Sequence, residues 1–266
     1  MNVPEKKDKP LTRYKMTLEY NGQGYAGWQR QRNVISIQQI VEESITGFSN
    51  QNVSITVAGR TDAGVHACAQ VFHVDLEPFS KPMDNFAILK AVNAYLRPHP
   101  ISIIKVEKAH ETFHARFDAT NKLYRYKIVN RSGMLALEKG LAWHIGKNLD
   151  IEAMRKGAAY LLGHHDFTTF RDSDCQAKSP IRTLDRLEII QDECKIPGQQ
   201  RITIELEAQS FLHHQVRNIA GTLSLVGLGK WRPEDVKTAL KAKDRSKGGP
   251  TAPADGLYLM RVDYPE

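Results

Sequence analysis

The segment GRTDAGVH (59–66) places an acidic side chain between two glycines, where it could act as a nucleophile. Gly59 and Gly64 flank Asp62, and Arg60 and Thr61 immediately precede it. Glycine lets the backbone form a tight turn that presents the carboxylate outward. A nearby guanidinium keeps a carboxylate ionised and able to attack an electrophilic carbon. The alternative is an aspartate that only shapes the turn.

The segment KLYRYK (122–127) combines aromatic rings with cations at a spacing that suits RNA. On a strand, Tyr124 and Tyr126 lie on one face while Arg125 and Lys127 lie on the other. Aromatic rings on an open sheet stack nucleobases, and neighbouring cations hold phosphates. The alternative is an amphipathic strand whose tyrosines face the core.

The segment FLHHQVRNIAG (211–221) carries Arg217 within an otherwise apolar helical stripe. A guanidinium in that position is unfavourable unless it is paired, so we expect a buried carboxylate partner. The alternative is an arginine whose long side chain reaches the surface.

Metal and nucleotide sites are not supported by the sequence. Neither His164-His165-Asp166 nor His213-His214 has the i, i+4 spacing of a zinc helix, and adjacent side chains on a helix or strand point in different directions. There is no Walker A loop, and GQGYAG (22–27) lacks the spacing of a dinucleotide-binding loop. We therefore predict no metal and no cofactor.

Composition favours a soluble globular protein with polyanionic partners. The 266 residues are 41% hydrophobic and 25% charged, with a net charge of +7. Three cysteines without a C-x-x-C pair are typical of reduced thiols in the cytosol. The first residues lack the apolar core of a signal peptide, and the longest apolar stretch, 219–229, is shorter than the ~20 residues that span a membrane. We expect a cytoplasmic protein.

The elements that must position these residues follow from hydrophobic periodicity. Strict alternation predicts a strand over 13–20, and the capping box of Ser36 and Gln39 starts a helix with an apolar stripe to Phe48. Further strands are predicted near 53–57, 70–75, 101–107, 122–129, 182–190, 201–208 and 256–264, and further helices near 84–96, 151–162, 216–223 and from Pro233.

This order predicts an α+β fold made of two βαββαβ units of the ferredoxin-like type, the second with an inserted helix. The sheets are expected to be antiparallel and to lie side by side, with helices on one face and a cleft between the halves. We divide the chain into a flexible leader (1–12), an N-terminal domain (13–108) that carries Asp62, and a C-terminal domain (109–266).

The chain closely resembles the tRNA pseudouridine synthase A family over nearly its whole length, from YNGQGYAGWQRQ (20–31) to APADGLYLMRVDYP (252–265). GRTDAGVHA is the most specific signature of the family. FHARFDAT followed by KLYRY, LLGHHDFTTFR and FLHHQVRNIAG stand in the family's order and spacing. Ala69 departs from the glycine that many relatives carry there, at a strand position of little consequence.

The resemblance implies roles for ten side chains. Asp62 would be the catalytic aspartate, Tyr124 the active-site aromatic residue and Arg217 the ion-pair partner of Asp62. Arg60 would grip the RNA backbone, and Leu257 would pack in the uracil pocket. The other expected substrate-binding residues are Arg30, Thr61, His66, Gln70 and Tyr126. The family fold has two RNP-like halves joined through one sheet, and its members are homodimers without a cofactor.

The implied reaction isomerises uridine to pseudouridine at positions 38, 39 and 40 of the tRNA anticodon stem-loop. The bond between N1 and C1′ breaks, the base turns, and C5 bonds to C1′. Attack of Asp62 on C6, attack on C1′ and a glycal route all fit the residues. The competing hypotheses are a non-catalytic RNA-binding protein with two RNP-like units and a synthase that acts at other RNA positions.

Overall fold

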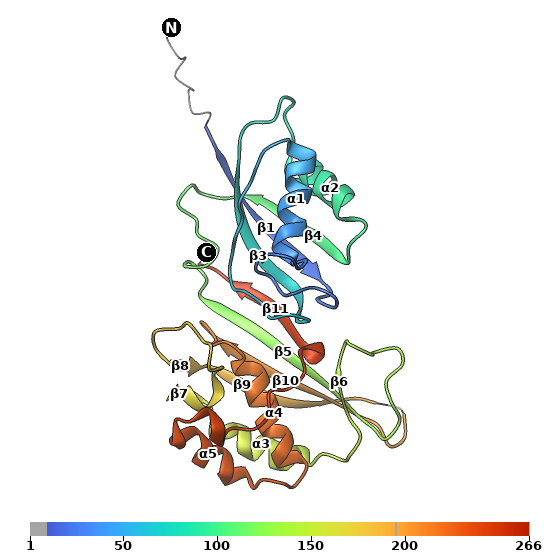
Figure 1. Cartoon of the computed structure of the whole chain (residues 1–266), viewed down its shortest axis with the longest axis vertical. Coiled ribbons are helices and arrows are strands. Elements are labelled where there is room, and N and C mark those ends of the chain that lie inside the picture. The colour runs from blue at the N-terminus through green and yellow to red at the C-terminus, as the bar shows by residue number, and fades with distance from the viewer. Residues whose placement is uncertain (1–9, 195, 266) are drawn as a thin grey trace.

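A single mixed sheet runs through the protein and joins the two halves of the chain (Figure 1). The computed structural model describes residues 10–194 and 196–265. Within these residues the strand order is β4-β1-β3-β11-β5-β10-β9, with β2 paired to β3 and β6 paired to β5. A separate hairpin of β7 and β8 lies outside this sheet.

The N-terminal half follows the predicted order of elements. Its strands and helices are β1 (Thr12–Tyr20), α1 (Ile37–Ser49), β2 (Thr56–Val57), β3 (His66–Leu76), α2 (Asn85–Leu96) and β4 (Ile101–Lys108). Alternate residues of β1, including Met16 and Leu18, are fully buried, as the alternation predicted. β2 is shorter than predicted because the backbone N–H of Ile55 donates to the Glu42 carboxylate at 3.2 Å instead of to a neighbouring strand.

The two N-terminal helices lie together beside this half of the sheet (Figure 1). α1 begins where the Ser36 hydroxyl accepts from the backbone N–H of Gln39 at 3.3 Å. α2 begins where the Asp84 carboxylate accepts from the N–H of Ala87 at 2.7 Å. These side chains satisfy backbone donors that a helix start leaves free.

The C-terminal half holds more elements than the sequence predicted. They are β5 (Asn121–Asn130), β6 (Trp143–Ile145), α3 (Ile151–Ala159), β7 (Gly163–Asp166), β8 (Ile181–Leu184), β9 (Arg186–Asp192), β10 (Gln200–Ala208), α4 (Gln215–Gly227), α5 (Pro233–Ala242) and β11 (Leu257–Asp263). Short 3₁₀ helices cover Thr168–Phe170, Arg245–Lys247 and Ala254–Gly256.

The single strand predicted over 182–190 is wrong, because the chain leaves the hairpin at Asp185 and enters the main sheet. The Asp185 N–H donates to the Glu207 carbonyl at 2.8 Å, so β9 begins beside β10, whereas β8 pairs with β7. The helix predicted over 151–162 ends at Ala159.

The strand β11 joins the halves and corrects the expectation of wholly antiparallel sheets. It pairs antiparallel with β5 but parallel with β3, through Tyr258 opposite His66 and Leu259 opposite Ala67. The connection between β4 and β5 is fastened at both ends, where Ala109 donates to the Arg13 carbonyl and Thr120 to the Asp263 carbonyl, each at 2.9 Å.

Most of the predicted leader, residues 1–9, lies outside the described residues, and its last residue, Thr12, already belongs to β1. Among the described residues, no helix is both long and apolar enough to span a bilayer.

Candidate active site

Asp62 lies in the loop between β2 and β3, at the border between the two halves of the sheet. A turn closes just after it, where the Val65 N–H donates to the Asp62 carbonyl at 3.1 Å. Gly64 takes φ +79°, a left-handed conformation that favours glycine. The Asp62 side chain is 22% exposed, so its carboxylate is accessible from a mostly protein environment.

Hydrogen bonds between uncharged groups hold this loop in place. The hydroxyls of Tyr20 and Thr61 lie 2.7 Å apart, and the Thr61 carbonyl accepts from the Trp28 N–H at 3.0 Å. The Gln70 amide donates to the Gly59 carbonyl at 2.8 Å. Burial raises the pKa of Tyr20 to about 12, so its phenol stays neutral. The loop position therefore does not depend on charge.

The glycine-rich segment 21–27 packs directly on the Asp62 loop. Gly27 has φ +88°, and a Cβ atom there would lie 2.7 Å from the Thr61 carbonyl oxygen. A Cβ atom on Gly22 would lie 2.0 Å from the Val65 carbonyl oxygen. Both contacts are shorter than real Cβ atoms allow, so only glycine fits. Glycine at these two positions therefore allows the backbone of segment 21–27 to pack directly against the backbone of the Asp62 loop.

The expected ion pair between Arg217 and Asp62 is present. Arg217 projects from α4, and its Nη1 lies 3.3 Å from Asp62 Oδ2. Its Nε donates to the Ala252 carbonyl at 2.8 Å, which fixes the guanidinium between two segments. The contact with the carboxylate involves one nitrogen rather than two, so it is not the bidentate pairing that arginine often forms.

Two histidines that the sequence analysis set aside lie against the same carboxylate. His213 Nε2 is 3.4 Å from Asp62 Oδ1, and His214 Nε2 is 3.3 Å from Asp62 Oδ2. Their rings stack with centroids 3.9 Å apart. The prediction that these adjacent side chains point in different directions is wrong, because His214 has φ +60°, which is neither strand nor helix geometry. The only feature of the sequence that could have indicated this cluster is the pair of adjacent histidines just before the predicted helix.

A second carboxylate, Asp172, lies on the far side of these rings. Asp172 Oδ2 is 2.5 Å from His214 Nδ1, and Asp172 Oδ1 is 3.9 Å from His213 Nδ1. The hydrogen bond from the Asp174 backbone N–H, and to a lesser extent the contact with the His214 imidazole, holds the pKa of Asp172 below its usual range. Sequence analysis did not single out Asp172, which comes from the loop after the 3₁₀ helix 168–170.

Asp62, His213 and His214 each offer a ligand-type atom, and these atoms lie within 4.8 Å of one another. Imidazole nitrogens and a carboxylate oxygen are ligands that zinc accepts. The cluster therefore corrects the sequence argument that the pair His213-His214 could not converge.

Tyr124 projects from β5 and is 8% exposed, with its ring edge-on to Phe211 at a centroid distance of 5.1 Å. Burial raises the pKa of Tyr124 far above its usual value, and the nearby Tyr20 and Asp62 raise it further. Its phenol is therefore neutral, and it is poorly suited to remove a proton from a carbon atom. Its side chain suits packing against a ring.

The other predicted substrate-binding residues divide by exposure. Arg60 is exposed beside Asp62. Arg30 is half exposed and forms ion pairs with Glu42 at 3.1 Å and Glu43 at 3.6 Å. Leu257 is buried where β11 begins.

Four of the predicted substrate-binding side chains are buried beneath the site rather than exposed on it: Thr61, His66, Gln70 and Tyr126. The Tyr126 phenol donates to the Pro253 carbonyl at 2.7 Å. His66 accepts from the Gly22 N–H through Nδ1 and lies 3.1 Å from the Gly140 carbonyl through Nε2. Each of the four is thus occupied in joining segments around Asp62.

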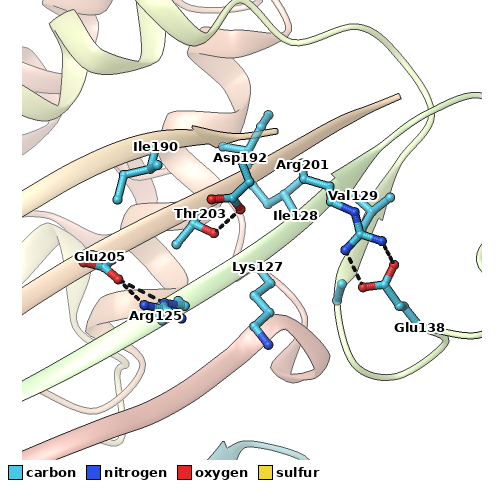
Figure 2. A pocket seen from close by; sticks show the side chains of 12 residues that line it. Arg125, Lys127, Ile128, Val129, Glu138, Ile190, Asp192, Arg201, Thr203 and Glu205 are labelled. Atoms are coloured by element: carbon cyan, nitrogen blue, oxygen red, sulfur yellow. Dashed lines mark hydrogen bonds and ion pairs between the residues drawn. The ribbon is translucent and has the colours of Figure 1, made fainter. Parts of the chain in front are cut away.

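Arg125 and Lys127 of KLYRYK line a polar cavity of about 230 Å³ over β5, β9 and β10 (Figure 2), whereas Lys122 is buried and donates to the Gln209 carbonyl at 3.1 Å. Arg125 pairs with Glu205 at 2.6 Å and Arg201 with Glu138 at 2.7 Å. Lys127 Nζ lies 4.0 Å from the centre of the Tyr258 ring. The two arginines of this cavity are therefore engaged within the protein.

A partly exposed aspartate, paired with an arginine from a helix of the C-terminal half, is an arrangement suited to nucleophilic attack on an electron-poor ring or sugar carbon. Comparison with known protein families identifies one that matches most of the chain. The family described as tRNA pseudouridine synthase matches residues 16–118 and 158–265.

Curated relatives match over almost the whole chain. A protein named tRNA pseudouridine synthase A from Methylocella silvestris is 50% identical over 96% of this chain and 100% of its own length. The protein of the same name from Parvibaculum lavamentivorans is 49% identical, over 96% and 100%. That from Paramagnetospirillum magneticum is 50% identical, over 96% of each chain. The chain belongs to the tRNA pseudouridine synthase family, whose members are isomerases acting on uridine in tRNA.

Proposed function

We propose that the protein isomerises uridine to pseudouridine at positions 38, 39 and 40 of the tRNA anticodon stem-loop, with Asp62 as the nucleophile. The observation that supports this most is the Asp62 carboxylate, 22% exposed and 3.3 Å from the guanidinium of Arg217. A paired carboxylate stays ionised and oriented, as a nucleophile must be.

The reaction is balanced within the substrate and the side chains. Asp62 bonds to a carbon of the target nucleotide, the bond between N1 and C1′ breaks, and C5 then bonds to C1′. The proton lost from C5 is matched by the one gained at N1, and Asp62 is released unchanged. No electron carrier is consumed, so we propose that no cofactor takes part.

We further propose that the reaction needs no metal. A cation held by Asp62, His213 and His214 would occupy the carboxylate oxygens that the nucleophile has to use. Activity in the presence of EDTA supports this proposal, whereas loss in EDTA that zinc restores refutes it.

Substrate binding is divided between two groups of residues in this proposal. Arg60 is exposed next to Asp62 and suits a phosphate of the RNA backbone. Leu257 and Tyr124 form the apolar surface against which the detached uracil packs. The target nucleotide has to leave its stack, at a cost of a few kcal/mol that contacts between cations and phosphates offset.

We propose that residues 13–108 and 109–266 form two RNP-like domains with the RNA cleft between them. The strand orders β4-β1-β3-β2 and β11-β5-β10-β9, each within one half, support this division. The homodimeric state and the cytoplasmic location rest on the family resemblance and the tRNA substrate. Analytical ultracentrifugation of the purified protein tests the dimer.

The deciding experiment incubates the protein with a panel of tRNA transcripts and maps pseudouridine chemically. Modification confined to positions 38, 39 and 40 is the expected result. Modification elsewhere indicates a synthase of different site specificity. Tight tRNA binding without any pseudouridine indicates an RNA-binding protein that is not an enzyme.

A further inference from the structure

Asp62, His214 and Asp172 form a continuous row of carboxylate, imidazole and carboxylate. Resting on the proposed role of Asp62 as nucleophile, we propose that His214, held by Asp172, is a positioning residue that fixes the reactive orientation of the Asp62 carboxylate. His214 thereby links the N-terminal loop to the C-terminal half.

The row is defined by contacts on both ring nitrogens. His214 Nδ1 lies 2.5 Å from Asp172 Oδ2, and His214 Nε2 lies 3.3 Å from Asp62 Oδ2. The three side chains are between 21% and 24% exposed, so water screens them only partly. Ionised carboxylates only accept hydrogen bonds, so an imidazole between two of them satisfies both when each nitrogen carries a proton.

The contacts distinguish the two oxygens of Asp62. Oδ2 faces both Arg217 Nη1 and His214 Nε2, each at 3.3 Å. Oδ1 lies near His213 alone, at 3.4 Å, and that ring is 41% exposed against 21% for His214. Oδ2 therefore accepts from Arg217 and lies against the His214 ring, whereas Oδ1 has the more exposed His213 ring beside it and is the oxygen assigned to face the substrate.

Asp172 is itself anchored, so the row is rigid at its far end. Its carboxylate accepts from the Asp174 N–H at 2.9 Å, and its own N–H donates to the His213 carbonyl at 3.0 Å. His214 has φ +60° and immediately precedes α4, which also carries Arg217. One helix start thus delivers both groups that hold Oδ2.

The test replaces His214 by glycine, which removes the ring and suits the left-handed backbone. Single-turnover release of tritium from tRNA labelled at C5 of uridine measures the chemical step, and filter binding measures the tRNA dissociation constant. We expect the rate to fall about 100-fold, a typical effect of losing one preorganised donor. The dissociation constant should stay within about two-fold, because the ring contacts Asp62 rather than RNA. Added imidazole should restore part of the rate.

Asp172→Asn tests the far end of the row. It should slow the same step, and the double variant with His214→Gly should be no slower than His214→Gly alone, because both changes disable one unit. His164→Ala is the matched control: this exposed histidine of β7 bonds to Thr183 in the separate hairpin. It should react at the wild-type rate and show no response to imidazole.

Three results overturn the proposal: a wild-type rate in His214→Gly, a loss confined to the tRNA dissociation constant, or a slow variant that imidazole does not restore. The last would mean that the ring only supports the local structure. Asp62→Asn separates this proposal from the proposed function. If that variant is inactive while His214→Gly is fully active, Asp62 keeps its role and the positioning by His214 is refuted.

Discussion

The two sides of the site hold Asp62 in contrasting ways. On the N-terminal side, neutral hydrogen bonds from Tyr20, Trp28 and Gln70 and the close approach of Gly27 fix the backbone of the loop. On the C-terminal side, the charged or polar side chains of Arg217 and His214 contact the carboxylate itself. One half sets where Asp62 lies, and the other sets its charge environment and orientation.

This division separates two kinds of failure. Changes on the N-terminal side should displace the loop and lower the stability of the fold. Changes on the C-terminal side should leave the loop in place and alter the chemistry. Variants of one side that behaved like variants of the other would show that the division is wrong.

The largest effect is expected for Asp62→Asn, which keeps the shape of the side chain but removes the nucleophile. Pseudouridine formation should fall below detection, while tRNA affinity holds or rises slightly, because one anion leaves a site for a polyanion. Arg60→Gln should do the opposite, weakening tRNA binding and flattening its dependence on salt. Single-turnover tritium release and filter binding over a salt series measure both. A near-normal rate for Asp62→Asn would mean that Asp62 only shapes the turn and has no part in the chemistry.

Arg217 tests the charged side. Arg217→Ala should slow the chemical step about 100-fold. It should also lower the free energy of unfolding by less than the ~3–5 kcal/mol of a fully buried pair, since both partners are partly exposed. Arg217→Lys should restore little activity, because an ammonium cannot reach the Ala252 carbonyl and Asp62 in the same planar geometry. Rates and urea denaturation check both variants, and a wild-type rate in the lysine variant would contradict the pairing.

Gly27 tests the neutral side, with Gly24 as its control. Both have positive φ, so an alanine at either position carries a strain of about 1–2 kcal/mol. A Cβ atom on Gly27 would also strike the Thr61 carbonyl, whereas one on Gly24 meets nothing within 4 Å. Urea denaturation should therefore show a clearly larger loss for Gly27→Ala, accompanied by lower activity. Equal losses in the two variants would show that the close approach to the Asp62 loop is unimportant.

The smallest effect concerns pH and His66. Burial lowers the pKa of His66 below the usual 6.5, so the folded state holds the ring neutral. The Gly22 N–H donates to Nδ1, and protonation there would remove that acceptor. This contribution to stability is therefore complete above pH 6.5 and is lost as pH falls below it.

The corresponding measurement is urea denaturation between about pH 7.5 and about pH 5.5, where a single group changes stability by at most ~1.4 kcal/mol per pH unit. His66→Gln should be less stable near neutrality and should show a shallower decline toward acid. His73, whose pKa burial also lowers, adds to the decline in both proteins and so does not disturb the comparison. Identical slopes would mean that His66 stays unprotonated through this range.

Much of the fold was predictable because its strands and helices carry clear local patterns. The alternation in β1 and the cap at Ser36 predicted these elements at nearly the right bounds. β6 and the division at Asp185 were missed because they depend on pairing with strands distant in the sequence.

The site was predictable in part. The family resemblance implied that Asp62 and Arg217 are partners, and the structure brings them together. His213, His214 and Asp172 were missed because a left-handed residue directs two neighbouring rings to one place, which no helical or strand period anticipates. The burial of His66 and Gln70 beneath the loop was not predictable, because it follows only from the three-dimensional packing.

The parallel pairing of β11 with β3 also bears on synthesis of the protein. All strands that pair with β3 from the N-terminal half emerge from the ribosome early, whereas β11 is the last strand of the described chain to emerge. Until it does, the start of β3 at His66 and Ala67 lacks a neighbouring strand on the side opposite β1. Arg217 is synthesised before β11, but the strand pairing that joins its half of the chain to β3, which follows the Asp62 loop, can form only once translation has passed Leu259.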